Sequence, residues 1–197
     1  IRSAAHLMQE LAEELRDRKH GVTVATCYPK YNLAEEMPKT FPPLAIENGI
    51  RVLRIKSLPH HKVSFIVRGL SQLILPGLFN AGIRRRLKGE SFDAVIVYSP
   101  PLPLWRVGSR IKADHGARFI LNVQDLFPQN AVDLNALRNP LLIRYFRRME
   151  RRAYRAADVV TVHSEGNRDF LLGRKAMSPD KLAVLHNWVD MDAGPAE

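Results

Sequence analysis

Cysteine is nearly absent from this chain of 197 residues, which contains a single one, Cys27. One cysteine cannot form an internal disulfide, so a disulfide-stabilised fold is excluded and a reducing compartment is favoured. The seven histidines are scattered, and none lies near other histidines or cysteines at the spacing of a zinc site. We therefore expect no structural metal. The hydrophobic fraction of 46% is sufficient for an ordinary apolar core.

The common nucleotide and hydrolase motifs are also missing. The sequence has no P-loop, no Gly-x-Gly-x-x-Gly and no Ser, His and Asp order typical of a catalytic triad. Internal repeats and low-complexity tracts are absent as well. The uncharged run 69–83 is shorter than the roughly 20 residues that a membrane-spanning helix needs. None of these motifs therefore identifies the chemistry.

Acidic residues are few beside the basic ones, since 20 Asp and Glu face 30 Lys and Arg and the formal net charge is +10. This excess favours an anionic partner, which could be nucleic acid, a phosphorylated ligand or an acidic membrane surface. The alternative is that the arginines only solvate helix faces. RNA-binding aromatic motifs and a helix-turn-helix pattern are lacking, so we expect no nucleic-acid partner.

Helical and strand patterns alternate along the chain. Residues 1–19 place apolar side chains on one helix face, and His20-Gly21 is predicted to end that helix with the glycine in the left-handed region. A parallel α/β domain normally begins with a strand, so we expect a first strand to be absent from this sequence. The chain is then interpreted as a fragment, ending where a second domain begins.

The remaining pattern predicts a Rossmann-like α/β fold, with a parallel sheet covered by helices on both faces. A Pro-rich loop and a turn at Glu47-Asn48-Gly49 interrupt the first half. A kink or break is expected at Pro76-Gly77. The expected strands are 22–27, 50–56, 92–97, 119–123, 159–162 and 182–185, and the expected helices are 62–88, 102–115, a short one past Pro128, 140–156 and 165–172.

Four of the apolar strands end in polar clusters. Because the carboxyl ends of parallel strands meet at one edge of a sheet, where ligands bind in open α/β folds, we expect these clusters to form the functional site. The clusters are Tyr98-Ser99-Pro100-Pro101, Gln124-Asp125, His163-Ser164-Glu165-Gly166-Asn167 and His186-Asn187-Trp188-Val189-Asp190.

Several residues of these clusters have two interpretations. Gln124 and Asp125 can orient a hydroxyl or a sugar, and Asp125 can accept a proton, but an Asp here can also cap the following turn or helix. Ser99 and Pro100 either place free N–H groups near an anion or simply join a strand to a helix. Ser164 is either a ligand or the N-cap of the next helix.

Two basic helical segments have apolar residues beside their arginines. The first has Arg68 before its uncharged run and Arg84, Arg85 and Arg86 after it, and the second carries Arg144, Arg148 and Arg151 on an amphipathic helix. Such helices can lie in a membrane interface, attracted by anionic lipid. They can equally be core helices with solvated basic faces. Two such helices together make a lipid surface more credible than one.

The order and spacing of four short motifs resemble one protein family. The chain resembles the N-terminal domain of family 4 (group 1) retaining glycosyltransferases, above all the bacterial branch that builds O-antigen, capsule and colanic-acid-type polysaccharides. The motifs are Val97-Tyr98-Ser99-Pro100-Pro101, Leu121-Asn122-Val123-Gln124-Asp125-Leu126-Phe127-Pro128, Ala157-Asp158-Val159-Val160-Thr161-Val162 with Ser164-Glu165-Gly166-Asn167, and His186-Asn187-Trp188-Val189-Asp190.

This resemblance implies a GT-B architecture, in which two Rossmann-like domains face a cleft. Residues 1–190 would be the acceptor-side N-terminal domain, and 191–197 the start of the interdomain linker. The expected substrates are a nucleotide-sugar donor and a saccharide acceptor linked to polyprenyl diphosphate, with retention of configuration and with no metal or other cofactor. The expected location is the cytoplasmic face of the cell membrane, on which the protein would be peripheral.

The resemblance also assigns site residues. Gln124 and Asp125 match a cleft pair that many relatives write as His followed by an acid, which implies sugar binding by Gln124 and a catalytic role for Asp125. Gln in place of His excludes an imidazole role at that position. Ser99, Pro100, Ser164 and Asn187 are further candidates for substrate binding, and the segment from Asn187 leads towards the linker.

The family's glycine-containing loop and its acidic donor-binding motif are not in this sequence, so we expect the chain alone to be inactive. Two alternatives share its features. A sugar-nucleotide epimerase of GT-B type has the same architecture, and a basic nucleic-acid-binding domain has the same charge.

Overall fold

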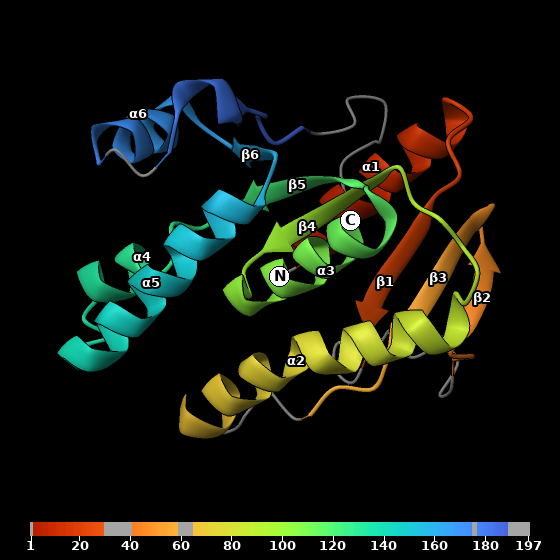
Figure 1. The fold of residues 1–197 in the computed structure, drawn as a ribbon, viewed down its shortest axis with the longest axis horizontal. Helices are drawn as coiled ribbons and strands as arrows, with labels where there is room; N and C mark the ends of the chain where they lie inside the picture. Colours follow the sequence, from red (N-terminus) through yellow and green to blue (C-terminus); the bar gives the residue numbers. More distant parts are fainter. Residues whose placement is uncertain (1, 30–40, 59–64, 175–176, 189–197) are drawn as a thin grey trace. The chain divides into compact units, whose positions relative to one another are not determined.

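The computed structural model describes residues 2–29, 41–58, 65–174 and 177–188 (Figure 1). Most of the predicted Pro-rich loop and the predicted linker 191–197 lie outside these ranges. The chain divides into two compact units, which are described separately. The first comprises residues 1–57, 81–88 and 187–197, and the second comprises residues 58–80 and 89–186.

The first unit contains a three-stranded sheet in the order β1-β3-β2. The strands β1 (Thr23–Cys27) and β3 (Ile50–Ile55) are parallel, whereas β2 (Leu44–Glu47) pairs with β3 antiparallel. The turn between β2 and β3 is expected from the sequence, whereas strand β2 is not. Asn48 and Gly49 have φ angles of 48° and 76°, the left-handed conformation that a tight two-residue hairpin turn requires.

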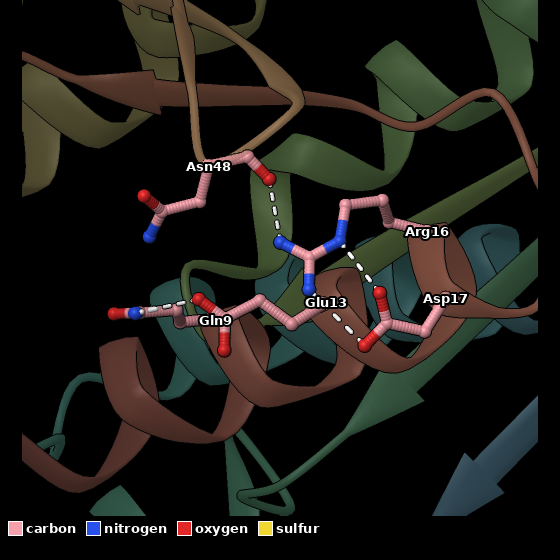
Figure 2. Close-up of polar contacts among 5 residues, drawn as sticks. All are labelled: Gln9, Glu13, Arg16, Asp17 and Asn48. Carbon is pink, nitrogen blue, oxygen red and sulfur yellow. Dashed lines mark hydrogen bonds and ion pairs between the residues drawn. The ribbon is translucent and has the colours of Figure 1, made fainter.

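Helix α1 (Arg2–Asp17) is held to this hairpin by Arg16. Figure 2 shows the guanidinium donating to the Asn48 carbonyl at 2.5 Å and to the Asp17 carboxylate at 2.8 and 3.1 Å. The helix ends earlier than predicted. The left-handed residue after it is Lys19, with φ 69°, and not Gly21, so the predicted glycine cap is wrong.

The sequence predicts a kink or a break at Pro76-Gly77, and the break does not occur, because helix α2 (Phe65–Arg86) continues through Pro76 as one element. A proline removes one backbone donor from a helix. Burial of the apolar side chains around it, including Leu75 and Phe79, offsets that loss. Its first part belongs to the second unit and its last turns to the first. Within the described ranges, no helix is both long and apolar enough to cross a membrane.

The second unit confirms the predicted parallel α/β sheet. Its strands are β4 (Ala94–Ser99), β5 (Arg118–Val123), β6 (Val159–Val162) and β7 (Leu182–Val184), hydrogen-bonded in this order and all parallel. Strand β4 ends two residues later than predicted, which places Tyr98 and Ser99 inside it. Figure 1 shows β5 beside β4, with β6 following.

Helices pack on one face of this sheet through a core centred on Phe119, Leu121 and Val123. The α3 residue Gly108 lies directly against the Phe119 ring. Tyr98, Asn122 and Thr161 alternate with core residues along their strands and therefore lie on the other face. The helical elements are η1 (Leu102–Leu104), α3 (Trp105–His115), α4 (Gln129–Asp133), α5 (Pro140–Ala156), α6 (Glu165–Gly173) and η2 (Pro179–Lys181).

Candidate active site at the strand ends

The parallel register brings the ends of four strands to one level. Ser99 of β4 pairs with Val123 of β5, which pairs with Val162 of β6, which pairs with Val184 of β7. Backbone hydrogen bonds between neighbouring strands continue just past the strand ends. The Gln124 N–H donates to the Ser99 carbonyl at 2.9 Å, and the ladder continues one residue beyond β7. The sheet therefore has the polar edge that the sequence predicts.

The Asp125 carboxylate is exposed at this edge, and within the described part of the chain it makes no hydrogen bond or ion pair. It does not cap the next helix, because the N-cap of α4 is Pro128 and has no side-chain cap bond. Burial raises the pKa of the Tyr98 phenol, and the negative charge of Asp125 raises it further. The Tyr98 phenol and the Asp125 carboxylate therefore lie within electrostatic range of each other.

Gln124 is buried and belongs to a polar row that the sequence analysis did not recognise. Its Nε2 donates to Asn122 Oδ1 at 2.9 Å, and Asn122 Nδ2 donates to Thr161 Oγ1 at 3.0 Å. All three residues are at most 9% exposed. The signal in the sequence is one asparagine inside the apolar run 119–123, but its partner lies on another strand.

Ser99 and Pro100 differ in accessibility. Ser99 is only 3% exposed within β4, and its carbonyl accepts the Gln124 N–H, whereas Pro100 is exposed. The helical turn that follows, η1, is three residues long and has no side-chain cap. This arrangement fits the simple transition from strand to helix, and Pro100 is the more accessible of the two to a ligand.

Ser164 is the N-cap of α6, because its Oγ accepts from the Asn167 N–H at 3.3 Å. The Asn167 amide also contacts His163 Nδ1 at 3.3 Å, so the first turn of α6 is tied to the end of β6. Asn187 is exposed beyond β7 and belongs to the first unit. The structure therefore brings Ser99, Pro100, Gln124 and Asp125 together through neighbouring strand ends.

The basic residues lie away from these strand ends in the chain, on two helices. Arg144, Arg148 and Arg151 are exposed on α5, and Arg84, Arg85 and Arg86 are exposed in the last turn of α2. The side chain of Arg68 lies outside the described residues. Two hollows of about 350 and 340 Å³ open on α5, and the second is lined by four arginines, Arg148, Arg151, Arg152 and Arg155. Across the described residues, no three His, Cys, Asp or Glu side chains gather as they would around a metal ion.

Comparison with known proteins identifies the family. The model of the glycosyl transferase 4-like domain matches residues 4–188, which is nearly the whole chain and includes the first three strand-end clusters and the start of the fourth. No curated protein matches the chain at a significant level. The fold agrees with the family match, since a parallel sheet flanked by helices is consistent with the Rossmann-like N-terminal half of a GT-B fold. The chain therefore belongs to the glycosyl transferase 4-like domain family.

Proposed function

We propose that the intact protein transfers a sugar from a nucleotide-sugar donor to a saccharide acceptor, with retention of configuration and without a metal or other cofactor. The observation that carries the proposal is the exposed Asp125 carboxylate beside Gln124 at the end of β5, which has no partner among the residues that the structure describes. A carboxylate and an amide at a strand end are suited to orienting sugar hydroxyls. Pro100, Ser99, Ser164 and Asn187 are the further candidates for substrate contacts.

In the reaction that we propose, the acceptor hydroxyl oxygen forms a bond to the anomeric carbon of the donor sugar on the same face that the diphosphate leaves, so the configuration is retained. The bond from that carbon to the diphosphate oxygen breaks, and the nucleoside diphosphate leaves. Asp125 accepts the proton of the attacking hydroxyl, while Gln124 accepts or donates a hydrogen bond at the sugar. A positioned general base contributes about 100- to 10,000-fold to a rate.

Substitution of Asp125 tests this assignment. We expect Asp125→Ala in the intact protein to lower kcat by at least about 100-fold, because the proton acceptor is lost. The melting temperature should stay unchanged, since the carboxylate makes no contact within the described residues. Asp169→Ala is a matched control, because Asp169 is an exposed carboxylate on α6 of the same unit. Turnover within a few-fold of wild type would contradict the role of Asp125.

The products distinguish transfer from epimerisation. Radiolabelled UDP-, GDP- and dTDP-hexoses are incubated with and without a short-chain polyprenyl diphosphate-linked N-acetylhexosamine. A glycosyltransferase needs the acceptor to release the nucleoside diphosphate and yields a longer saccharide. Conversion of the donor to its epimer without acceptor would contradict the proposal.

We further propose that the acceptor is lipid-linked, as in the synthesis of bacterial surface polysaccharides, and that the protein works as a peripheral protein on the cytoplasmic face of the membrane. The support is α5, where the arginines form no ion pair with any described residue. The apolar side chains of Leu141, Leu142 and Tyr145 are 75%, 43% and 42% exposed at the same helix's first turns. A basic helix with exposed apolar residues suits an anionic lipid surface.

Vesicle binding tests the membrane proposal. We expect the protein to sediment with phosphatidylcholine vesicles that contain phosphatidylglycerol and to stay in the supernatant with phosphatidylcholine alone, because unpaired arginines attract anionic headgroups. Added salt should release it. Equal binding to both kinds of vesicle would contradict an electrostatic attachment.

A further inference from the structure

A row of buried polar side chains crosses from β6 to the end of β5. Thr161, Asn122 and Gln124 are 8%, 2% and 9% exposed, and two hydrogen bonds of 3.0 and 2.9 Å join them. The row lies on the sheet face opposite the apolar core, because these residues alternate with core residues along their strands. It ends at Gln124, next to the exposed Asp125.

Stability alone does not account for this row. Asparagine is depleted in β-strands, and buried amides must be matched with partners to avoid a desolvation cost. Replacing both partners of such a hydrogen bond by apolar groups of the same shape is often neutral for stability. Apolar residues at positions 122 and 161 would therefore stabilise the sheet equally well. The polar row is better explained by its effect on Gln124, the residue at its end.

The hydrogen bonds run in one direction. Thr161 Oγ1 accepts from the Asn122 amide, so the Asn122 oxygen faces the other way and accepts from Gln124 Nε2. One of the two N–H groups of the Gln124 carboxamide is thereby used, and this bond fixes the plane of the amide. Its oxygen, Oε1, forms no hydrogen bond with the described residues and is left as an acceptor.

We propose that Thr161 and Asn122 are positioning residues, which fix the Gln124 carboxamide with its oxygen presented to a hydroxyl group of the acceptor sugar. The inference rests on the proposed glycosyl transfer and deepens it, because it assigns the ligand chemistry at Gln124. A carbonyl oxygen held in this way selects a hydroxyl or amine donor and disfavours a group that can only accept. Thr161 and Asn122 themselves need not touch the substrate.

Removing the hydroxyl that anchors the row is the decisive change. Thr161→Val keeps the side-chain shape but removes the hydrogen-bond acceptor, so the Asn122 and Gln124 amides can rotate. We expect kcat/KM for the polyprenyl diphosphate-linked N-acetylhexosamine to fall roughly tenfold, chiefly through a higher KM, since one oriented hydrogen bond is lost. Thr161→Ser restores the hydroxyl and should restore kcat/KM.

Val160→Ala is the matched control on the same strand. Val160 is fully buried on the core face, so this variant loses stability without touching the row. We expect it to keep the wild-type KM. Wild-type kinetics for Thr161→Val, or an equal rise in KM for Val160→Ala, would overturn the inference.

A second measurement separates this inference from the proposed function. In ¹⁵N-labelled protein, the side-chain amide signals of Asn122 and Gln124 should shift in Thr161→Val and return to their wild-type positions in Thr161→Ser. Unchanged amide signals would overturn the row as a positioning device, whether or not sugar is transferred. Absence of transfer by the wild-type protein, with the amide shifts present, would refute the glycosyltransferase assignment instead.

Discussion

Glu150 is a partly buried carboxyl group on α5 of the second unit. The Tyr154 hydroxyl donates to its Oε1 at 3.1 Å. Burial raises the pKa of Glu150, and this effect exceeds the opposing ones of the Tyr154 hydrogen bond and of Arg174, Arg147 and Arg151. The folded protein therefore binds this proton more tightly than the unfolded chain, so its contribution to stability is largest at low pH and declines as the pH rises through the raised pKa.

At the scale of this residue, we expect Glu150→Gln to raise the free energy of unfolding at pH 7. Glutamine has no charge to desolvate, and its oxygen can still accept from the Tyr154 hydroxyl. The difference from wild type should vanish below the ordinary carboxyl pKa of 4.5, where Glu150 is protonated in both states. Urea unfolding at several pH values measures this difference in unfolding free energy. Asp169→Asn, which changes an exposed carboxylate, is the control. A destabilised Glu150→Gln at neutral pH would contradict the argument.

Asp158 links three elements at the other end of the sheet. Its carboxylate accepts from the backbone N–H of Phe119 at 2.9 Å and forms an ion pair with Lys112 of α3. Both interactions favour the charged form and lower the pKa of Asp158, with the Lys112 bond as the larger cause. This contribution to stability is present above the unfolded pKa and is lost as the pH falls through the folded one.

We therefore expect Asp158→Asn to be less stable than wild type at pH 7, because the Lys112 ammonium loses its charged partner. The stability difference should narrow as the pH falls below about 4, where the wild-type carboxylate also takes up its proton. Thermal melts between neutral and acidic pH measure this difference. A difference that is constant with pH would show that the charge of Asp158 is not what matters.

Helix α3 packs on β5 so closely that its glycine has no room for a side chain. A Cβ at Gly108 would stand 2.3 Å from the Phe119 ring, which is fully buried. We expect Gly108→Ala to cost about 1–3 kcal/mol of unfolding free energy, because the ring cannot move away in a packed core. Gly77→Ala is the control, since Gly77 of α2 has open space around it and alanine favours a helix. Equal urea midpoints for wild type and Gly108→Ala would contradict the close packing of α3 on Phe119.

The elements that the sequence predicted are those whose signals are local. Helix α5 has the predicted bounds because Asn139 caps it and Pro140 occupies its first position, and both signals lie within a few residues. Strand β2 was missed because it is four residues long, follows two prolines and depends on pairing with β3. The same reason hid the polar row, since the contact between Asn122 and Thr161 depends on the register of β5 against β6.

The candidate site was predictable in place but not in detail. The four polar clusters follow from apolar runs that any parallel sheet would align at one edge. Whether Asp125 caps a helix or stays free could not be read from the sequence, because both roles use the same carboxylate and depend on the path of the backbone after it. Here that path gives α4 a different N-cap, so the Asp125 carboxylate does not cap that helix.

For the whole molecule, the charge of +10 raises the question of whether vesicle binding reflects total charge or one surface. Two triple substitutions remove the same charge from different helices: Arg148, Arg151 and Arg155 to Gln on α5, and Arg84, Arg85 and Arg86 to Gln on α2. Each arginine at an anionic membrane surface contributes about 1 kcal/mol, so three contribute on the order of 100-fold in affinity. Those on α5 share their helix with the exposed Leu141 and Leu142, which can enter the interface beside them.

We therefore expect the α5 triple variant to lose on the order of 100-fold in affinity for vesicles that contain phosphatidylglycerol, and the α2 variant to lose much less. Sedimentation at fixed ionic strength gives both affinities, and circular dichroism checks that each variant is folded. An equal loss would mean that net charge alone attracts the protein and that α5 is not the contact. A larger loss for the α2 variant would move the membrane surface to the end of that helix. The comparison is matched in charge, so only the position of the arginines separates the outcomes.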